Sequence, residues 1–198
     1  MEKIKQPEIV VFAGPNGSGK STFTELLRPP LYDYINADEI KKNLKCSDLE
    51  AAQLAEKQRE EHVANNESFC FETVLSTERN LNLLRRAKAK GYFIRCYYVL
   101  TADPLINVYR IKSRVLLGGH DVPREKIISR YDGCLELMKQ VIAVSDICHV
   151  YDNSESEPFR IFKKRKAACF YDECEDWPKE KIEAYSGVSS AVQKNLNL

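Results

Sequence analysis

Eight residues near the beginning of the 198-residue chain have the spacing of a phosphate-binding loop. Their letters, GPNGSGKS, fit the pattern G-x-x-x-x-G-K-[ST]. Glycines let such a loop curl until several N–H groups point at one anion, and the following helix N-terminus adds partial positive charge. Lys20 can then reach the outer phosphates of ATP, and the Ser21 hydroxyl can hold Mg²⁺. The residues expected to hold the nucleotide are Gly14, Pro15, Asn16, Gly17, Ser18, Gly19, Lys20, Ser21 and Thr22.

The segments on both sides of this loop match the elements that position it. Residues 9–13, IVVFA, are apolar and β-branched, which is typical of a buried parallel strand. Residues 21–27 are expected to form a helix that ends before Pro29. The alternative is a glycine-rich turn with an incidental lysine, but such a turn needs neither the strand nor the helix. The context therefore predicts a site for a nucleoside triphosphate.

Strands and helices alternate along the rest of the chain without an internal repeat. Further strands are expected at 34–36, 68–71, 92–100, 147–151 and, as an edge strand, 159–170. Further helices are expected at 39–44, 50–65, 76–90, 103–119, 123–145 and in the tail at 177–198. This order predicts an α/β fold, a three-layer sandwich around a five- or six-stranded, mostly parallel sheet. The length fits a single domain over 1–198, with an arginine-bearing lid around 104–130 and a helical extension over 175–198.

Polar residues at the carboxyl ends of the expected strands are candidates for chemistry, because ligands of such sheets bind there. Asp38 can take the proton of an acceptor hydroxyl in a phosphoryl transfer, or cap the helix that follows it. Glu72 can accept hydrogen bonds from a sugar hydroxyl, hold Mg²⁺ through water, or face solvent. Thr73 and Ser76 can line the same opening, although Ser76 is equally suited to cap the next helix. Asp152 can contact a nucleotide base or ribose, or form a turn.

A basic segment surrounds a pair of glycines at 118–119. Arg110 and Arg114 are four residues apart and share one helix face, where like charges repel unless an anion neutralises them. A hinged flap that carries these arginines would exclude water and supply cations to a migrating phosphoryl group. Alternatively, the arginines form a solvated basic face. His120 can donate to a phosphate, or it can simply be part of a polar loop. The basic residues of this segment are Arg110, Arg114, His120, Arg124 and Arg130.

Five short motifs, in this order, resemble those of the zeta toxin family of bacterial P-loop kinases. They are GPNGSGKST at 14–22, NAD at 36–38, FETVLS at 71–76, RVLLGGHDVP at 114–123 and YDNS at 151–154. The resemblance implies a P-loop kinase-type fold that uses ATP and Mg²⁺. It also implies transfer of a phosphoryl group to the 3′-hydroxyl of UDP-N-acetylglucosamine or a related UDP-sugar. A small helical antitoxin is the partner protein that the resemblance implies.

The same resemblance assigns roles to individual residues. It makes Asp38 the base, and Glu72 with Thr73 the pair that contacts the substrate. Either Arg110 or Arg114 matches the first of two phosphate-binding arginines in the flap. The residues at and near the second arginine position are His120, which occupies it, Arg124 and Arg130.

Composition argues against several classes of partner. A net charge of +1, with 43% hydrophobic and 30% charged residues, describes an ordinary globule without a long-range field. We therefore expect a small-molecule acceptor, and neither nucleic acid nor a membrane as partner. The seven cysteines are an odd number spread over expected strands and helices, which indicates reduced thiols in the cytoplasm. Cys169 and Cys174 are close in sequence, but no second ligand pair for a zinc site follows them.

Two other functions agree with the same residues. One is a different small-molecule kinase built on the same core. The other is a P-loop protein whose partner reads its nucleotide state without any phosphoryl transfer.

Overall fold

The computed structural model describes residues 6–119 and 121–194, and in that part of the chain the strands form one eight-stranded sheet. The strands are β1 (Glu8–Ala13), β2 (Asp33–Ile35), β3 (Phe69–Thr73), β4 (Phe93–Leu100), β5 (Ile147–Asp152), β6 (Phe159–Arg165), β7 (Ala168–Tyr171) and β8 (Val192–Gln193). The helices are α1 (Lys20–Leu27), α2 (Ala37–Leu44), α3 (Asp48–Asn65), α4 (Glu78–Ala89), α5 (Pro104–Leu116), α6 (Arg124–Val144) and α7 (Lys179–Ser186).

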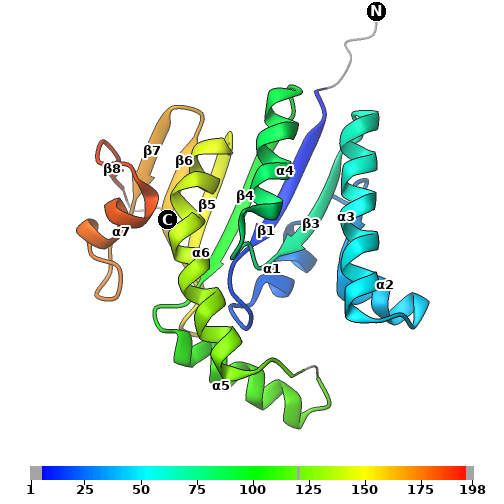
Figure 1. Ribbon diagram of the computed structural model, residues 1–198. Coiled ribbons are helices and arrows are strands. Elements are labelled where there is room, and N and C mark those ends of the chain that lie inside the picture. Colours follow the sequence, from blue (N-terminus) through cyan, green and yellow to red (C-terminus); the bar gives the residue numbers. More distant parts are fainter. Residues whose placement is uncertain (1–5, 120, 195–198) are drawn as a thin grey trace, which may run out of the picture.

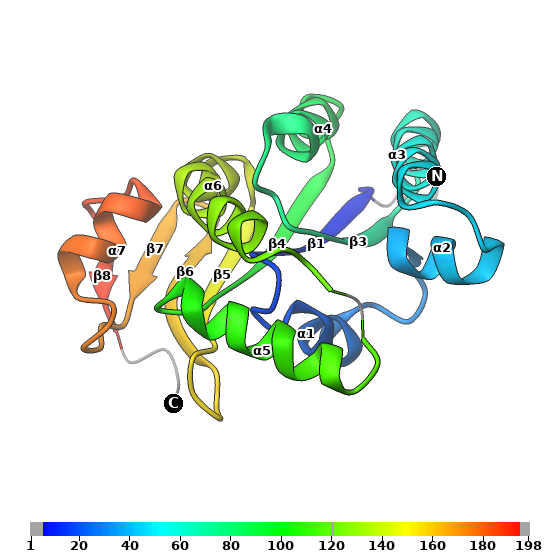
Figure 2. The same ribbon diagram turned by 60° about the horizontal axis from the view of Figure 1, so that its bottom comes forward.

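The sheet order is β2-β3-β1-β4-β5-β6-β7-β8. Pairing is parallel from β2 to β5, antiparallel from β5 to β7, and parallel between β7 and β8. Because parallel strands need crossover connections, helices α1 to α6 join the first five strands and cover both faces. Figure 1 shows α4 and α6 in front of the sheet, and Figure 2 shows α3, α4 and α6 on one face with α1 and α5 on the other. The predicted three-layer α/β fold with a mostly parallel sheet is confirmed.

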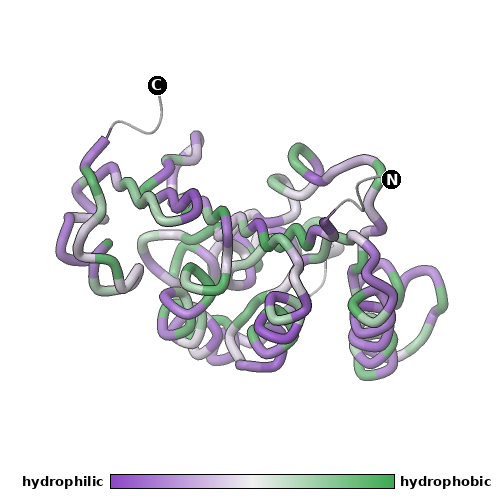
Figure 3. The backbone as a smooth tube through the Cα atoms, turned by 90° about the horizontal axis from the view of Figure 1, so that it is seen from above, coloured by the Kyte–Doolittle hydropathy of each residue, from purple (hydrophilic) through white to green (hydrophobic). Residues whose placement is uncertain are grey.

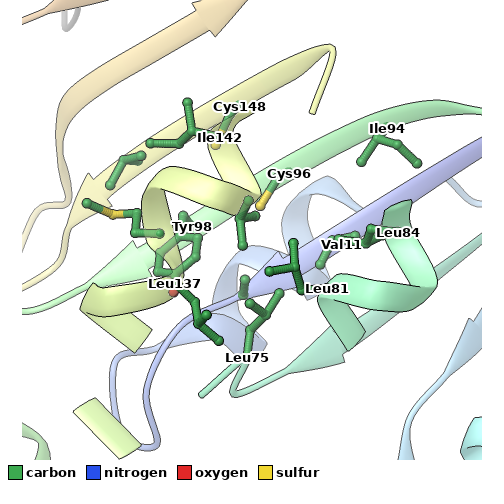
Figure 4. Packing of buried hydrophobic residues seen from close by; sticks show 14 of the residues in the cluster. Val11, Leu75, Leu81, Leu84, Ile94, Cys96, Tyr98, Leu137, Ile142 and Cys148 are labelled. Carbon is green, nitrogen blue, oxygen red and sulfur yellow. The ribbon is translucent and has the colours of Figure 1, made fainter. Parts of the chain in front are cut away.

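The main hydrophobic core lies between the sheet and helices α4 and α6. Leu84 of α4 and Leu137 of α6 lie here together with Val11 of β1, and all three are buried (Figure 4). Burying a side chain of this size stabilises the fold by about 1.5–3 kcal/mol. Tyr98 is also buried, and its hydroxyl donates to the Cys134 carbonyl oxygen at 2.7 Å, so the polar group is satisfied. Figure 3 shows apolar strands through the middle of the molecule and polar residues on the outer turns of the helices.

Beyond β5 the structure differs from the expectation. The single edge strand expected over 159–170 is a hairpin of β6 and β7, because the chain turns at Lys166, where φ is +55°. In the described part of the expected helical tail, α7 accounts for eight residues and is followed by strand β8. The sheet therefore has eight strands rather than five or six. Trp177 is fully buried in the main core and anchors this region.

The N-terminus of α3 has a capping box. The Ser47 hydroxyl accepts from the Glu50 N–H at 3.3 Å, and the Glu50 carboxylate accepts from the Ser47 N–H at 2.9 Å. Ser47 is thus the N-cap of α3, and Asp48 is its first helical residue. This cap fixes the end of α3 that approaches the site described next.

Candidate functional site

A cleft of about 720 Å³ opens at the carboxyl ends of β1 and β3, where a ligand was expected to bind. The predicted site residues that line it are Asn16, Gly17, Gly19, Lys20, Ser21, Asp38, Glu72, Thr73, Arg110, Arg114 and Arg130. Its other lining residues are Asn36, Ala37, Asp48, Ala51, Val74, Ile111, Asp121, Val122, Pro123 and Lys126. The cleft is therefore built from the phosphate loop, the ends of β2 and β3, and helices α2, α3, α5 and α6.

The phosphate loop is held by two asparagine side chains from distant parts of the chain. The Asn107 amide nitrogen donates to the Asn16 carbonyl oxygen at 2.8 Å, and the Asn153 amide nitrogen donates to the Ser18 carbonyl oxygen at 2.8 Å. With these carbonyls engaged, the loop N–H groups are the ones left to meet an anion. At Gly14, φ is +140° and a Cβ atom would lie 2.0 Å from the Val99 carbonyl oxygen, so no larger residue fits there.

Lys20 begins α1 and lies inside the loop. Its side chain is buried, and its ammonium group donates to the Pro15 carbonyl oxygen at 2.9 Å. Burial lowers the pKa of Lys20, while the nearby carboxylates of Glu72 and Asp38 act in the opposite direction. A phosphate group in the cleft would supply the negative charge that a buried ammonium group lacks.

Glu72 connects the phosphate loop with strand β2. One of its carboxylate oxygens, Oε2, accepts from the Ser21 hydroxyl at 3.3 Å, and the other, Oε1, accepts from the Tyr34 hydroxyl at 2.8 Å. Of the three sequence-based alternatives for Glu72, a carboxylate that merely faces solvent is wrong. A hydroxyl and a carboxylate side by side at the loop form an oxygen donor set that suits Mg²⁺. Groups of three or more His, Cys, Asp and Glu side chains that could hold a metal ion do not occur in the described residues, either here or elsewhere.

Asp38 lies in the first turn of α2 and faces the cleft. The residue that caps α2 is Asn36, whose side-chain oxygen accepts from the N–H groups of Asp38 at 2.8 Å and Glu39 at 3.4 Å. The alternative that Asp38 itself caps this helix is therefore wrong. A carboxylate that has no capping role is available for an acceptor hydroxyl. The NAD motif contained this information, because Asn is as good an N-cap as Asp.

The arginines of the basic segment are placed by two helices, α5 and α6. Arg110 on α5 donates to the carbonyl oxygens of Asn153 at 2.7 Å and Ser154 at 3.0 Å, and so ties α5 to the end of β5. Arg114 lines the cleft one helical turn later, as expected from the spacing. Arg130 on α6 donates to the Asn16 side-chain oxygen at 3.1 Å, next to the phosphate loop.

One cation of the cleft was missed. Lys126 lies on α6 four residues before Arg130, and both line the cleft. The spacing that drew attention to Arg110 and Arg114 applies equally to Lys126 and Arg130, so the signal was present in the sequence.

Several predicted residues do not line the cleft. The Asp152 carboxylate is buried and accepts from the N–H and hydroxyl of Ser154 at 3.1 and 2.6 Å, and burial raises its pKa. These hydrogen bonds are those of a turn, which was the alternative role for Asp152. Ser76 lines a separate shallow groove beside Gly133 on α6. The remaining predicted residues away from the cleft lining are Gly14, Pro15, Ser18, Thr22 and Arg124, and His120 lies outside the described residues.

In residues 6–119 and 121–194, helices long and apolar enough to span a bilayer do not occur. All seven cysteines are free thiols, and four of them are buried.

Comparison with known proteins relates this chain to a protein family. A family model described as Zeta toxin matches residues 28–176. A curated relative from Haemophilus influenzae (strain ATCC 51907 / DSM 11121 / KW20 / Rd), described as an uncharacterized protein, is 27% identical over 133 residues. That match covers 65% of this chain and 95% of the relative.

Two solved structures share the fold. One belongs to the PezAT chromosomal toxin–antitoxin system of Streptococcus pneumoniae, with a TM-score of 0.59, 16% identity, and coverage of 82% of this chain and 73% of that chain. The other is the AvrRxo1-ORF1:-ORF2 structure with ATP, with a TM-score of 0.68, 16% identity, and coverage of 93% and 64%. This chain thus spans less than two thirds of the AvrRxo1 chain that it matches.

Proposed function

The chain belongs to the zeta toxin family, and from this premise we propose that it is an ATP-dependent kinase acting on a hydroxyl of a small acceptor. The observation that carries the proposal is one cleft that has the Lys20 loop on one side and the Asp38 carboxylate on the other. Phosphoryl transfer needs little covalent chemistry, so a site that positions both reactants and balances their charge is sufficient. The AvrRxo1 structure with ATP supports ATP as the donor.

Several residues of the cleft have a role in this reaction. The loop N–H groups and Lys20 bind the β- and γ-phosphates, and Arg110 and Arg114 balance the charge that spreads over the migrating group. Asp38 accepts the proton of the attacking hydroxyl, which leaves that oxygen free to bond to the γ-phosphorus while the bond to the β-phosphate oxygen breaks. Ser21 and Glu72 would hold Mg²⁺, which neutralises phosphate charge when bound.

We propose a single domain in which α5, the Gly118–Gly119 loop and the beginning of α6 form the lid. At Gly118, φ is +85°, and a Cβ atom there would meet no other atom within 4 Å. At Gly119 a Cβ atom would lie 2.5 Å from Cγ of Arg114, so what supports a hinge for the lid is the backbone freedom of the two glycines.

The acceptor and the protein partner are proposed from the family. UDP-N-acetylglucosamine or a related UDP-sugar is the first acceptor to test, and a small antitoxin is the proposed partner, as the toxin–antitoxin pairing of PezAT supports. The free thiols support a reducing compartment such as the cytoplasm.

The direct test is transfer from ATP to a panel of UDP-sugars, followed by ³¹P NMR of the products. Asp38→Asn should reduce acceptor-dependent turnover by about 10²–10⁴-fold, the usual contribution of a general base. ATP should bind this variant as tightly as it binds the parent. Glu39→Gln is the matched control, because it neutralises the neighbouring carboxylate on α2 that does not line the cleft, and it should keep full turnover.

The outcomes separate the alternatives. Full turnover by Asp38→Asn would show that another group is the base. ATP binding without transfer to any acceptor would favour a nucleotide-dependent binding protein over a kinase.

A further inference from the structure

Tyr34 lies on β2. Through hydrogen bonds it connects the cap of α2, the helix that carries Asp38, with Glu72 beside the phosphate loop. Its hydroxyl donates to Oε1 of Glu72 at 2.8 Å and accepts from the side-chain nitrogen of Asn36 at 2.6 Å. The second carboxylate oxygen of Glu72 accepts from the Ser21 hydroxyl at 3.3 Å. A continuous series of hydrogen bonds therefore runs from the cap of α2, through the ends of β2 and β3, to the phosphate loop. Tyr34 itself does not line the cleft.

The direction of each bond in this series is fixed. The side-chain oxygen of Asn36 accepts from two N–H groups of α2, so its nitrogen is the atom turned toward Tyr34. Because Asn36 donates to the Tyr34 oxygen, the Tyr34 proton is directed to Glu72.

We propose that Tyr34 is a positioning residue, which holds the Glu72 carboxylate against Ser21 and thereby prepares the Mg²⁺ side of the phosphate loop. A carboxylate beside a metal site orients the metal ligands only if its own rotation is restricted, and such supporting bonds tune metal affinity. The inference rests on the proposed function for the identity of the bound nucleotide. It adds that the same series of bonds reaches the cap of the helix that carries Asp38.

The competing explanation is that Tyr34 serves only to pack. Its ring belongs to a small cluster with Phe23 on the face of the sheet that α1 covers, and the Arg28 guanidinium lies 5.0 Å from the ring centroid. Replacement by phenylalanine keeps the ring in this cluster and removes only the hydroxyl. The two explanations therefore predict different results for Tyr34→Phe.

The chain offers a matched control two residues earlier. The Tyr32 hydroxyl also donates to a glutamate, Oε2 of Glu8, at 2.8 Å, and its ring packs in the same cluster. Glu8 begins β1, whereas the phosphate loop follows the end of β1. Glu72 lies opposite Phe12, four residues along β1 from Glu8, so the two glutamates are about 13 Å apart along the strands at 3.3 Å per residue. Tyr32→Phe removes an equivalent bond far from the cleft.

The experiment measures ATP affinity by titration calorimetry, without acceptor, in excess Mg²⁺ and again in EDTA. Tyr34→Phe should weaken ATP binding about tenfold in Mg²⁺, the scale of a lost hydrogen bond to a charged group, and leave it unchanged in EDTA. Tyr32→Phe should match the parent under both conditions. Adding Tyr34→Phe to Glu72→Gln should weaken binding no further than Glu72→Gln alone, because the hydroxyl acts through that carboxylate.

Three results would overturn the proposal. Tyr34→Phe could bind ATP as the parent does under both conditions, or lose equal affinity in Mg²⁺ and EDTA, as a packing defect would. It could also raise only the acceptor KM, which would place Glu72 on the acceptor side instead. Because the titration contains no acceptor, it tests Tyr34 even if no acceptor is phosphorylated, so the two proposals can fail independently.

Discussion

Replacement of Asn107 by alanine should destabilise the fold and weaken ATP binding together. Asn107 on α5 is fully buried, and its amide nitrogen donates to the Asn16 carbonyl oxygen at 2.8 Å. Its amide oxygen accepts from the Thr101 hydroxyl, which keeps a second acceptor, the Asp103 carbonyl oxygen, at 3.2 Å. Asn107→Ala therefore mainly removes the hydrogen-bond donor of the Asn16 carbonyl oxygen and leaves empty the space that the amide filled.

The size of the effect follows from these contacts. Leaving one buried acceptor unsatisfied costs about 1–3 kcal/mol, and a second, partly replaced hydrogen bond adds up to about 1 kcal/mol. We therefore expect about 1–4 kcal/mol less stability. For a chain of this size, where each kcal/mol shifts Tm by about 2–4 °C, that lowers Tm by roughly 2–16 °C. The loop loses one of its two asparagine supports, so ATP affinity should also fall.

Thermal unfolding with and without ATP measures both effects in one assay. Asn107→Asp is a second variant, since it places a carboxylate oxygen against the Asn16 carbonyl and should be at least as unstable as Asn107→Ala. Asn82→Ala is the control, because the Asn82 side-chain oxygen on α4 accepts from Arg85 at the exposed surface. If Asn107→Ala unfolds at the temperature of the control and binds ATP like the parent, Asn107 does not support the loop.

Two further predictions concern the side of the sheet formed by β5 to β8. Burial, with help from Arg160, Lys163 and Arg95, lowers the pKa of His149 to about 4. Its unfolded pKa is about 6.5, so the unfolded chain takes up a proton that the fold resists, and stability is lost as pH falls from 6.5 to 4. Tm measured from pH 7.5 to 4 should therefore fall more steeply in the parent than in His149→Gln, and parallel curves would contradict this. Trp177→Ala should cost about 3–5 kcal/mol, because it empties a fully buried site, and Trp177→Phe should cost less. Urea unfolding followed by circular dichroism measures both variants, since the chain has no other tryptophan to report by fluorescence.

The parts of the fold that the sequence predicted are those whose signals are local. The phosphate loop, the strand before it and the helix after it occupy adjacent residues. The turn at Lys166 was missed because it carries neither glycine nor asparagine, the usual residues at positive φ. The tail was predicted to be helical from its polarity, but in its described part α7 covers only Lys179–Ser186, between Pro178 at its N-cap and Gly187, where φ is +69°.

Of the residues predicted at strand ends, Asp38, Glu72 and Thr73 line the cleft and Asp152 does not, whereas partners distant in the sequence were not predicted. Asp38, Glu72 and Arg114 reach the cleft because they follow or face the carboxyl ends of the strands. Asn107 is 91 residues from the loop carbonyl that it holds, and this pairing leaves no periodic pattern in the sequence. Such long-range hydrogen-bond partners can be identified only from the folded structure.

The difference between local contacts and contacts between distant residues also matters for the proposed reaction. The phosphate loop is continuous in sequence. The part of the cleft that would receive the acceptor is instead assembled from the end of β2, α2 and α3, and it meets the loop through the hydrogen bond between Tyr34 and Glu72, 38 residues apart. A substitution in the loop removes ATP binding directly. Tyr34→Phe instead removes the hydroxyl that joins the two parts, and its ring should keep its packing. Measurements of Mg²⁺-dependent ATP affinity and of acceptor turnover on the same Tyr34→Phe protein therefore show whether nucleotide and acceptor are positioned as one unit.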